Sequence, residues 1–543
     1  MKLHVLGAAF LVPLLTAAAP AVEIDAGRIK EHVRILSSDR FAGRGPTQTG
    51  ERKTIEYLAR QFRKAGLQPG GKNGSWYQDV PLVRYERVGP PKLSLQVAGQ
   101  TVPLIAGRQV TAASGMVGKT ALKNSEMVFL GYGMVAPELG WNSFEGVDLT
   151  GKVAVFLAGD ADFESPQPGQ FGGRTLVYGG RFGAKAAAAA KAGAAAVLVV
   201  HETAPASYPW SQIANNESAP TYSLRPAPGA ALFGLTGWLH RDVATDLFRR
   251  AGLDFNALKV RARDKSFRAL AIGDARLSAD LETRSTPLIS RNVVARLLGT
   301  RFPQESVIFG AHWDANGIGA PDAKGDAIRN GAVDNATGTA TLLEIARAFG
   351  RGNRPERSIL FIGYTAEEKG LLGAEHYVAN PLAPLETTAA VFNLDPHVVI
   401  GKARSLDLIG GGRTGLEQDL VRAAARHGLR VEEERSPEAG WYFRSDHFAF
   451  AKKGVPALVY RAGRDLVQGG KAAGGVAIEH YNANRYHQTS DEFDPAWDMA
   501  GAVQEGQIAY ELGRDLATSR RWPTWNEGVE YKLIRDATAA ARR

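Results

Sequence analysis

The second half of the chain contains an ordered series of histidine, aspartate and glutamate residues close to the ends of apolar runs. The series consists of His312, Asp334, Glu368, Asp395 and His487. Two imidazoles and three carboxylates, one of them shared, are enough to hold two zinc ions. Glu367 stands directly before Glu368 and offers a further carboxylate that can act as a base. The series therefore predicts a hydrolase that uses two metal ions.

His312 and Asp334 have surroundings in the sequence that suit metal ligands. His312 follows the apolar run VIFGA, and Asp314 can accept the proton on its other ring nitrogen and so fix the tautomer. Asp334 lies in the segment NGAVDNATGTA, ahead of an expected helix. Taken singly, His312 is better explained as a core histidine and Asp334 as a helix N-cap. The position of Asp334 between other candidate ligands favours a metal role.

The remaining acidic candidates also follow expected strands. Of the adjacent Glu367 and Glu368, one side chain can bind metal while its neighbour takes a proton from a water activated there. Stabilisation of a helix N-terminus is the structural alternative for this pair. Asp395 ends the buried run VFNLD, where an unpaired charge is costly, so it needs a metal or an arginine as its partner.

His487 lies in the polar segment NRYHQTSDE, ahead of the last long helix. Its neighbour Tyr486 can donate a hydrogen bond to an oxyanion that develops during hydrolysis. Simple packing explains Tyr486 equally well.

Composition excludes several other classes of protein. The 543 residues are 44% hydrophobic and 22% charged, as expected for a folded chain of about two domains. There is no cysteine, which excludes thiolate zinc ligands, a cysteine nucleophile and a disulfide scaffold. The net charge of +9 is spread over the chain without aromatic and basic interleaving, so we expect no nucleic-acid partner.

The first 21 residues resemble a secretory signal peptide. Lys2 precedes the apolar run Val5–Leu15, and Ala19-Pro20-Ala21 offers small residues for cleavage. The apolar run is shorter than the about 20 residues that cross a bilayer. We therefore expect an exported protein, periplasmic or secreted, with no stable membrane insertion.

Alternating strand and helix patterns predict where the candidate ligands lie in the fold. Residues 26–37 and 50–65 have helical periodicity, and the turn-rich segment SSDRFAGRGPTQTG separates them. From residue 290 onward, strand-like runs such as SVIFGAH, SILFIGYT, AAVFNLD, SLDLIGG and VPALVY alternate with helical segments. This order predicts an α/β fold with a mostly parallel sheet covered by helices on both faces. Ligands of such sheets bind at the carboxyl ends of the strands, where the candidate residues fall.

Residues 124–274 differ from the rest of the chain in composition and predict a separate small α/β domain. The segment GRFGAKAAAAAKAGAAAVLVV reads as an alanine-rich helix followed by a β-branched strand. The predicted organisation is therefore a signal peptide at 1–21, a first part of the catalytic domain at 22–123, an inserted domain at 124–274 and the main catalytic part at 275–543.

The motifs AHWD, GAVDNATG, YTAEEKGLLGAEHY, NLD, RSDHFAFAKKGVPA and RYHQTSDE together resemble the co-catalytic zinc exopeptidases. This family includes bacterial leucyl-type aminopeptidases and glutamate carboxypeptidases, and its sheet is of the phosphorylase/hydrolase-like type. The alanine-rich block is similar to the protease-associated domain that the family often carries as an insertion.

The resemblance implies a role for each residue of the series. Asp334 would bridge two zinc ions, Glu368 and His487 would complete one site, and His312 and Asp395 would complete the other. Glu367 would be the general acid/base and Asp314 the hydrogen-bond partner of His312. Asp446 and His447 match a recurring SDH element for which we assign no role. Asp395 is followed by Pro-His-Val-Val, unlike many relatives, so the substrate preference transfers less well than the chemistry.

The resulting expectation is an aminopeptidase acting on peptides, of unspecified oligomeric state. A carboxypeptidase or dipeptidase on the same fold is the alternative, and would need a basic pocket to which Arg444 and Arg461 can contribute. A glutaminyl cyclase uses one zinc ion, so the five-residue set argues against it. A catalytically inactive binding protein is disfavoured because all of the expected ligands are present.

Overall fold

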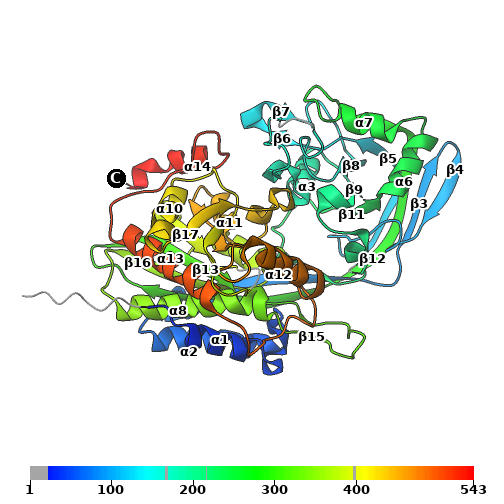
Figure 1. The fold of residues 1–543 in the computed structure, drawn as a ribbon. Coiled ribbons are helices and arrows are strands. Elements are labelled where there is room, and N and C mark those ends of the chain that lie inside the picture. Colours follow the sequence, from blue (N-terminus) through cyan, green and yellow to red (C-terminus); the bar gives the residue numbers. More distant parts are fainter. Residues whose placement is uncertain (1–22, 166–168, 216, 396–398, 543) are drawn as a thin grey trace, which may run out of the picture.

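The computed structural model describes residues 23–165, 169–215, 217–395 and 399–542, which form two lobes (Figure 1). The predicted signal peptide lies outside these residues. The large lobe contains the N-terminal helices and nearly everything after residue 290, and the small lobe contains most of residues 92–281. One sheet of 14 strands extends through both lobes.

The sheet of the large lobe is parallel at its centre. Its strands lie in the order β16 (Arg357–Tyr364), β13 (Phe302–His312), β17 (Thr388–Asn393) and β20 (Ala457–Leu458), each parallel to its neighbour. Every residue of β16 and β17 is buried. These strands read as continuous apolar runs because helices cover both of their faces.

Helices of the large lobe form two layers around this sheet. A cluster of buried apolar side chains joins one face to α1, α2, α8, α10 and α13, and a second cluster joins the other face to α9 and α11. The bounds are α1 (Ala26–Leu36), α2 (Thr49–Lys64), α8 (Gly338–Arg351), α9 (Leu372–Ala379), α10 (Leu416–Arg426), α11 (His447–Ala451), α12 (Gly470–Asn484), α13 (Ala500–Ala517) and α14 (Lys532–Ala537). The predicted fold class, a helix-covered α/β sheet with an inserted α/β domain, is confirmed.

The small lobe also contains a set of parallel neighbouring strands. Its strands β5 (Gly118–Phe129), β8 (Val153–Leu157), β9 (Ala196–His201) and β11 (Leu235–His240) are parallel neighbours. The alanine-rich segment forms α3 (Phe182–Lys191), directly before β9, as its composition predicts. Other elements here are β3 (Lys92–Val97), β4 (Gln100–Leu104), β6 (Val135–Ala136), β7 (Trp141–Asn142), α4 (Thr203–Ala206), α5 (Trp210–Asn215), β10 (Thr221–Leu224), α6 (Arg241–Arg250) and α7 (Phe255–Arg261).

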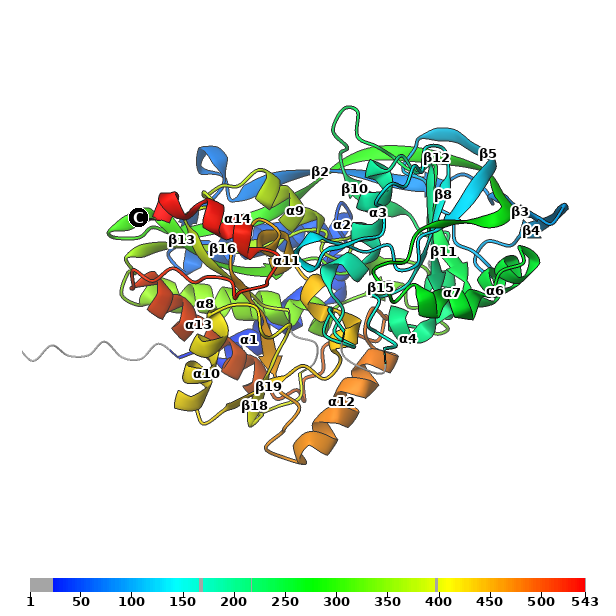
Figure 2. The ribbon, with the colours of Figure 1, turned by 90° about the horizontal axis from the view of Figure 1, so that it is seen from above.

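A single long strand connects the two lobes. β12 (Leu270–Leu297) pairs with β5 and β3 in the small lobe and with β16 in the large lobe, always antiparallel. Between these ends it pairs with β2 (Tyr77–Arg87) over eleven residues. Seen from above, β12 and β2 run together from one lobe toward the other (Figure 2).

Two of the predicted strands do not join the large sheet as expected. The segment SLDLIGG forms β18 (Ser405–Leu408), which pairs with β19 (Arg430–Glu433) and β21 (Tyr460–Ala462) in a separate three-stranded sheet. The segment VPALVY is divided between β20 in the large sheet and β21 in the small one. An apolar run predicts a buried strand but not its hydrogen-bonding partner, and this is why the prediction was wrong here.

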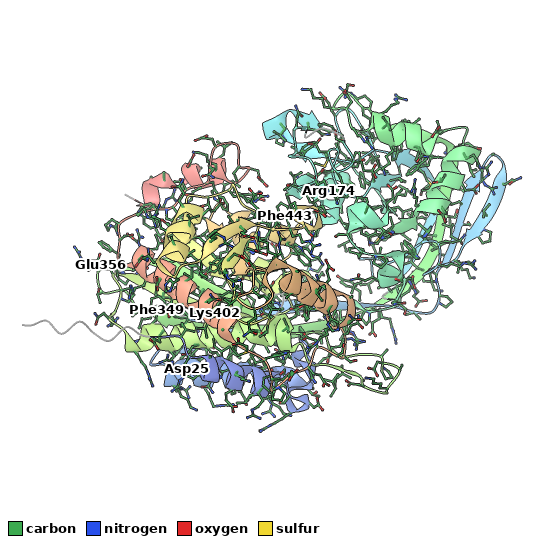
Figure 3. The ribbon with its side chains drawn as sticks, viewed as in Figure 1. Asp25, Arg174, Phe349, Glu356, Lys402 and Phe443 are labelled. Atoms are coloured by element: carbon green, nitrogen blue, oxygen red, sulfur yellow. The ribbon has the colours of Figure 1, made fainter. Side chains whose placement is uncertain are left out.

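Direct contacts also hold the small lobe against the large one. The guanidinium of Arg174 lies 3.1 Å from the carboxylate of Glu438, and both Arg174 and nearby Phe443 are labelled where the lobes meet (Figure 3). The ring of Tyr178 packs on those of Phe443 and Phe448, at centroid separations of 6.3 and 5.1 Å. The small lobe therefore contributes side chains close to the candidate ligands.

Among the described residues, none of the helices combines the length and the apolar character needed to cross a bilayer.

Candidate metal centre

Three neighbouring strands deliver most of the predicted ligands to one edge of the large sheet. His312 is the last residue of β13, Glu367 and Glu368 follow β16, and Asp395 follows β17. Because β16, β13 and β17 are parallel neighbours, their carboxyl ends meet.

Asp334 reaches the same place from the start of a helix. It lies in a turn of π-helix (Ala332–Thr337) that leads into α8, and its peptide bond to Asn335 is cis. At the first residue of α8, a Cβ on Gly338 would lie 2.3 Å from the carbonyl oxygen of Leu394. The glycine therefore lets the helix begin against the end of β17, and so beside Asp395.

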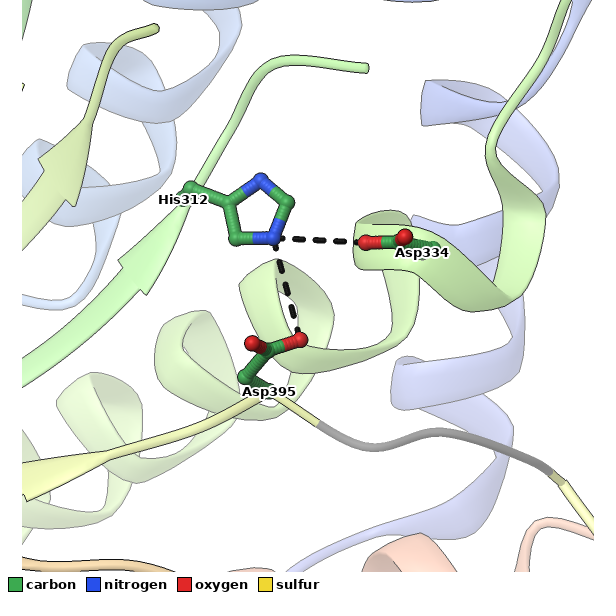
Figure 4. Close-up of side chains that lie close together, drawn as sticks. All are labelled: His312, Asp334 and Asp395. Atoms are coloured by element: carbon green, nitrogen blue, oxygen red, sulfur yellow. Dashed lines mark ion pairs between the residues drawn. The ribbon is translucent and has the colours of Figure 1, made fainter. Parts of the chain in front are cut away.

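The first group of candidate ligands surrounds the Nε2 atom of His312 (Figure 4). This nitrogen lies 3.3 Å from Oδ1 of Asp334 and 3.7 Å from Oδ1 of Asp395. The His312 side chain is 1% exposed, so its ring orientation is fixed by packing. One donor atom from each of the three residues lies within 4.8 Å of the others, which is a spacing that a single ion can bridge.

The second group forms around His487, in the loop after α12. Its Nε2 atom lies 3.2 Å from Oδ2 of Asp334 and 3.1 Å from Oε2 of Glu368. Asp334 therefore presents one carboxylate oxygen to each histidine. The structure thus brings all five predicted ligands together in two groups that share Asp334.

The electrostatics of the cluster fit a site for cations. Burial alone would lower the pKa of His312, but Glu367, Asp334 and Asp395 outweigh it and hold that pKa well above its usual value. Burial similarly opposes protonation of His487, yet Glu368 and Asp334 raise its pKa to about 10. Both imidazoles thus face an excess of buried negative charge, which divalent cations would neutralise.

Asp314 is buried beside His312, but its carboxylate makes different contacts from those expected. The Nδ1 atom of His312 lies 3.1 Å from the backbone carbonyl oxygen of Asp314 and 3.8 Å from its carboxylate. The carboxylate accepts a hydrogen bond from the backbone N–H of Glu367 at 3.1 Å and faces that of Glu368 at 3.4 Å. Asp314 thus holds the turn that carries both glutamates, while its backbone carbonyl orients the histidine ring.

A cavity of about 360 Å³ opens onto Glu367, Glu368 and His487. Burial, reinforced by neighbouring carboxylates, raises the pKa of Glu367 well above its usual value. Tyr486 lines the same cavity and stacks on the His487 ring, with 3.8 Å between the ring centroids. Tyr178, Arg181, Gly183 and Ala184 from the small lobe form part of the wall, so both lobes enclose the site.

Asp446 and His447 lie in the interior rather than on the wall of this cavity. Both are fully buried, and the His447 ring packs on that of Tyr442 with 4.7 Å between centroids. Burial lowers the pKa of His447 to about 3, so the ring is neutral.

Two residues that support the site were not predicted from the sequence. Asp491 accepts hydrogen bonds from the backbone N–H groups of Val333 and Asp334 at 3.1–3.3 Å. Arg44 donates to the backbone carbonyl of Trp313, which lies between His312 and Asp314. Asp491 could have been found from the sequence, because it stands four residues after His487 in an acidic segment. For Arg44 the sequence shows only that it lies in a turn-rich segment.

Comparison with known proteins finds two family matches within the chain. Residues 292–510 match the model of peptidase family M28, and residues 103–232 match that of the PA domain. A probable zinc metalloprotease of Pyrenophora teres f. teres is 36% identical over 121 residues, which are 22% of this chain and 25% of that protein. A probable lipoprotein aminopeptidase, LpqL, of Mycobacterium tuberculosis is 26% identical over 242 residues, which are 41% and 45% of the two chains.

The chain thus spans from a quarter to under half of the length of these curated relatives. Among solved structures, an aminopeptidase from Aneurinibacillus sp. strain AM-1 aligns over 91% of this chain and 95% of its own, with 19% identity and a TM-score of 0.49. The matched PA segment overlaps the predicted insertion at 124–274 without defining its ends. The segment that contains the candidate ligands thus has the sequence of a peptidase family M28 domain, and the segment before it has that of a PA domain.

Proposed function

We propose that the protein is an aminopeptidase that removes N-terminal residues from peptides with the help of two zinc ions. The observation that carries this proposal is the division of the Asp334 carboxylate between two histidines, at 3.3 Å from His312 and 3.2 Å from His487. His312 and Asp395 would hold one ion, Glu368 and His487 the other, and Asp334 both. Bound zinc would supply an acidified water and a Lewis acid for the scissile carbonyl.

Glu367 would move protons in this reaction. Its carboxylate lies 3.8 Å from Nε2 of His312 and lines the cavity beside the ligands. It would take a proton from the attacking water and return it to the leaving amine. Tyr486, in the same wall, would donate a hydrogen bond to the developing oxyanion. The acidic surroundings also suit the free α-amine of a peptide substrate.

The test is hydrolysis of aminoacyl-anilides and short peptides, each free and N-acetylated, by metal-stripped protein with and without added zinc. Zinc-dependent cleavage of the free-amine substrates alone is expected. Cleavage of N-acetylated peptides from their carboxyl end would contradict the aminopeptidase assignment. Binding of fewer than two zinc ions per active chain would contradict the two-ion site.

A carboxypeptidase or dipeptidase is the second candidate, and one observation favours it. Arg181 of the small lobe and Arg444 of the large lobe line the same cavity as Glu367, and among the described residues neither has an acidic partner. Burial, reinforced by the charge of Arg444, lowers the pKa of Arg181 to about 10, so Arg181 remains a cation at neutral pH. Arg461, by contrast, donates to the backbone carbonyl of Asp395 at 3.1 Å. Amidating the peptide carboxyl terminus would abolish turnover by such an enzyme and leave an aminopeptidase active.

We also propose that the protein is exported, because residues 1–21 have the charge, length and small residues of a signal peptide. The N-terminal sequence of the mature protein, recovered from the periplasm or the medium, would begin near residue 22. An intact N-terminus on cytoplasmic protein would contradict export.

A further inference from the structure

We propose that Arg44 is a positioning residue of the metal centre, which fixes the distance between the chain segments of His312 and Asp334. This inference rests on the proposed zinc site. It concerns a part of the chain, the turn SSDRFAGRGPTQTG, that contributes no ligand to either group.

The guanidinium of Arg44 is wholly buried, and among the described residues it bonds only to backbone carbonyl oxygens. It donates to Trp313 at 2.8 Å, to Leu36 at 2.8 Å, and to Asn330 and Gly331 at 2.7 Å each. All four of these acceptors are neutral carbonyl oxygens, and within the part of the chain that the structure describes no carboxylate forms an ion pair with Arg44. Burying a cation without a paired anion is costly. This cost is offset here by the planar guanidinium, which donates several hydrogen bonds at once in a fixed geometry.

The four acceptors show what that task is. The carbonyl of Trp313 belongs to the residue between His312 and Asp314. The carbonyls of Asn330 and Gly331 come from the approach to Asp334, four and three residues before it. One planar group therefore links the segment that ends β13 to the segment that enters α8. These are the segments that carry the histidine of the first group and the carboxylate that both groups share.

The turn that carries Arg44 fits tightly against the same region. Gly43 has a φ of +63°, and a Cβ there would lie 2.5 Å from the carbonyl oxygen of Arg329 and 2.9 Å from Cα of Gly317. These two residues belong to the hairpin of β14 (Gly317–Ile318) and β15 (Ile328–Arg329), between His312 and Asp334 in the chain. The side chain of Asn330 in turn donates to the Asp39 carboxylate at 2.9 Å. The turn can hold this position only with glycine at residue 43.

Arg44 also lies close enough to the carboxylates to influence them. The charges of Asp491, Asp314, Asp334 and Glu368 all act on the guanidinium, in that order of strength. A fixed cation behind the cluster offsets part of the repulsion between its carboxylates before metal binds. A lysine would keep this charge but cannot reproduce the planar fork of donors.

The experiment compares zinc affinity in Arg44→Lys and in the full-length wild-type protein, by competition with a chromogenic chelator. Loss of residues that orient metal ligands weakens metal binding by about 10- to 100-fold, and we expect a loss of this size. The matched control is Arg357→Lys. Arg357 is equally buried and donates to the carbonyls of Leu516 and Arg521 at 2.9 and 2.8 Å, and it lies at the opposite end of β16. The control should lose stability but bind zinc as the wild type does.

Wild-type zinc affinity in a folded Arg44→Lys protein would overturn the proposal. If that variant does not fold, Gly43→Ala decides, because it displaces the turn while keeping the arginine. Weakened zinc binding in Gly43→Ala supports the proposal, and unchanged binding rejects it. Failure of the wild type itself to bind zinc would instead reject the proposed function.

Discussion

Asp334 is the residue on which the two halves of the candidate site depend. Its two oxygens face different histidines, whereas each of the other ligands belongs to one group only. The neighbouring carboxylate of Glu367 is outside both groups. The proposed ligand Asp334 and the proposed base Glu367 have the same chemical type and would thus be distinguished by position alone.

This distinction predicts the behaviour of Glu367→Gln. The amide keeps the size of the side chain but cannot accept a proton, so turnover should fall by about 10²- to 10⁴-fold. Zinc content, measured on the same preparation by atomic spectroscopy, should stay at the wild-type value. Glu368→Gln is the matched control, because it should lose zinc as well as activity. A loss of zinc in Glu367→Gln would show that Glu367 is a ligand.

At the scale of residues, the sequence predicts side chains that are candidate ligands or bases. It does not predict side chains whose partners are backbone groups of distant segments. His312, Glu367 and Asp395 were predicted because strand ends are visible as apolar runs that stop at a polar residue. Arg44 and Asp491 bond to carbonyl and N–H groups of distant segments, and every residue has such groups. Only a fold shows which of them are close.

At the scale of elements, α1 and α2 meet through a partly buried polar contact. Nδ1 of His32 on α1 lies 2.6 Å from the hydroxyl of Tyr57 on α2. Burial lowers the pKa of His32 to about 4, below the value of about 6.5 for an unfolded chain. The folded state therefore resists protonation of this ring, and its stability falls as the pH drops below 6.5.

The prediction concerns the difference in unfolding free energy between the wild type and His32→Phe, both metal-stripped. Between pH 7 and pH 5 the wild type should lose about 1–2 kcal/mol of unfolding free energy relative to His32→Phe. Urea titrations at the two pH values measure it. A difference that does not change with pH would mean that His32 takes up its proton as readily in the folded state.

The elements themselves were predicted better than their partners. Helical periodicity located α1 and α2 closely, because each buries one apolar stripe. The sequence predicted that β18 would belong to the large sheet, but it lies in the separate three-stranded sheet. The same apolar run suits a strand of either sheet. The length of β12 was also not foreseen, because its polar and apolar residues alternate through a segment that crosses from one lobe to the other.

At the scale of the whole molecule, each lobe has its own apolar interior. One cluster runs through the N-terminal helices and the large sheet, and another joins β3 to β12 within the small lobe. Separate cores suggest separate units of unfolding. The candidate ligands all belong to the large lobe, so zinc should stabilise only that unit.

Calorimetry of the full chain with and without a chelator tests this expectation. Removing zinc should lower the transition of the large lobe by about 5–10 °C and leave the other transition in place, given a stabilisation of about 3 kcal/mol at saturating zinc. Glu367→Gln should respond to the chelator as the wild type does, whereas His487→Ala should respond less. A single transition that moves as a whole would show that the lobes unfold together.

The continuity of β12 limits how this protein can be divided. Its first half pairs on one edge with β5 and on the other with β3, and both partners lie in the small lobe. Excising that lobe would leave a ribbon of unsatisfied backbone N–H and C=O groups extending from the peptidase sheet. Such a ribbon is a template for association with other chains, so a truncated enzyme should aggregate even with its active site intact. Gain or loss of the small lobe in related chains would thus require a new partner for β12 at the same step.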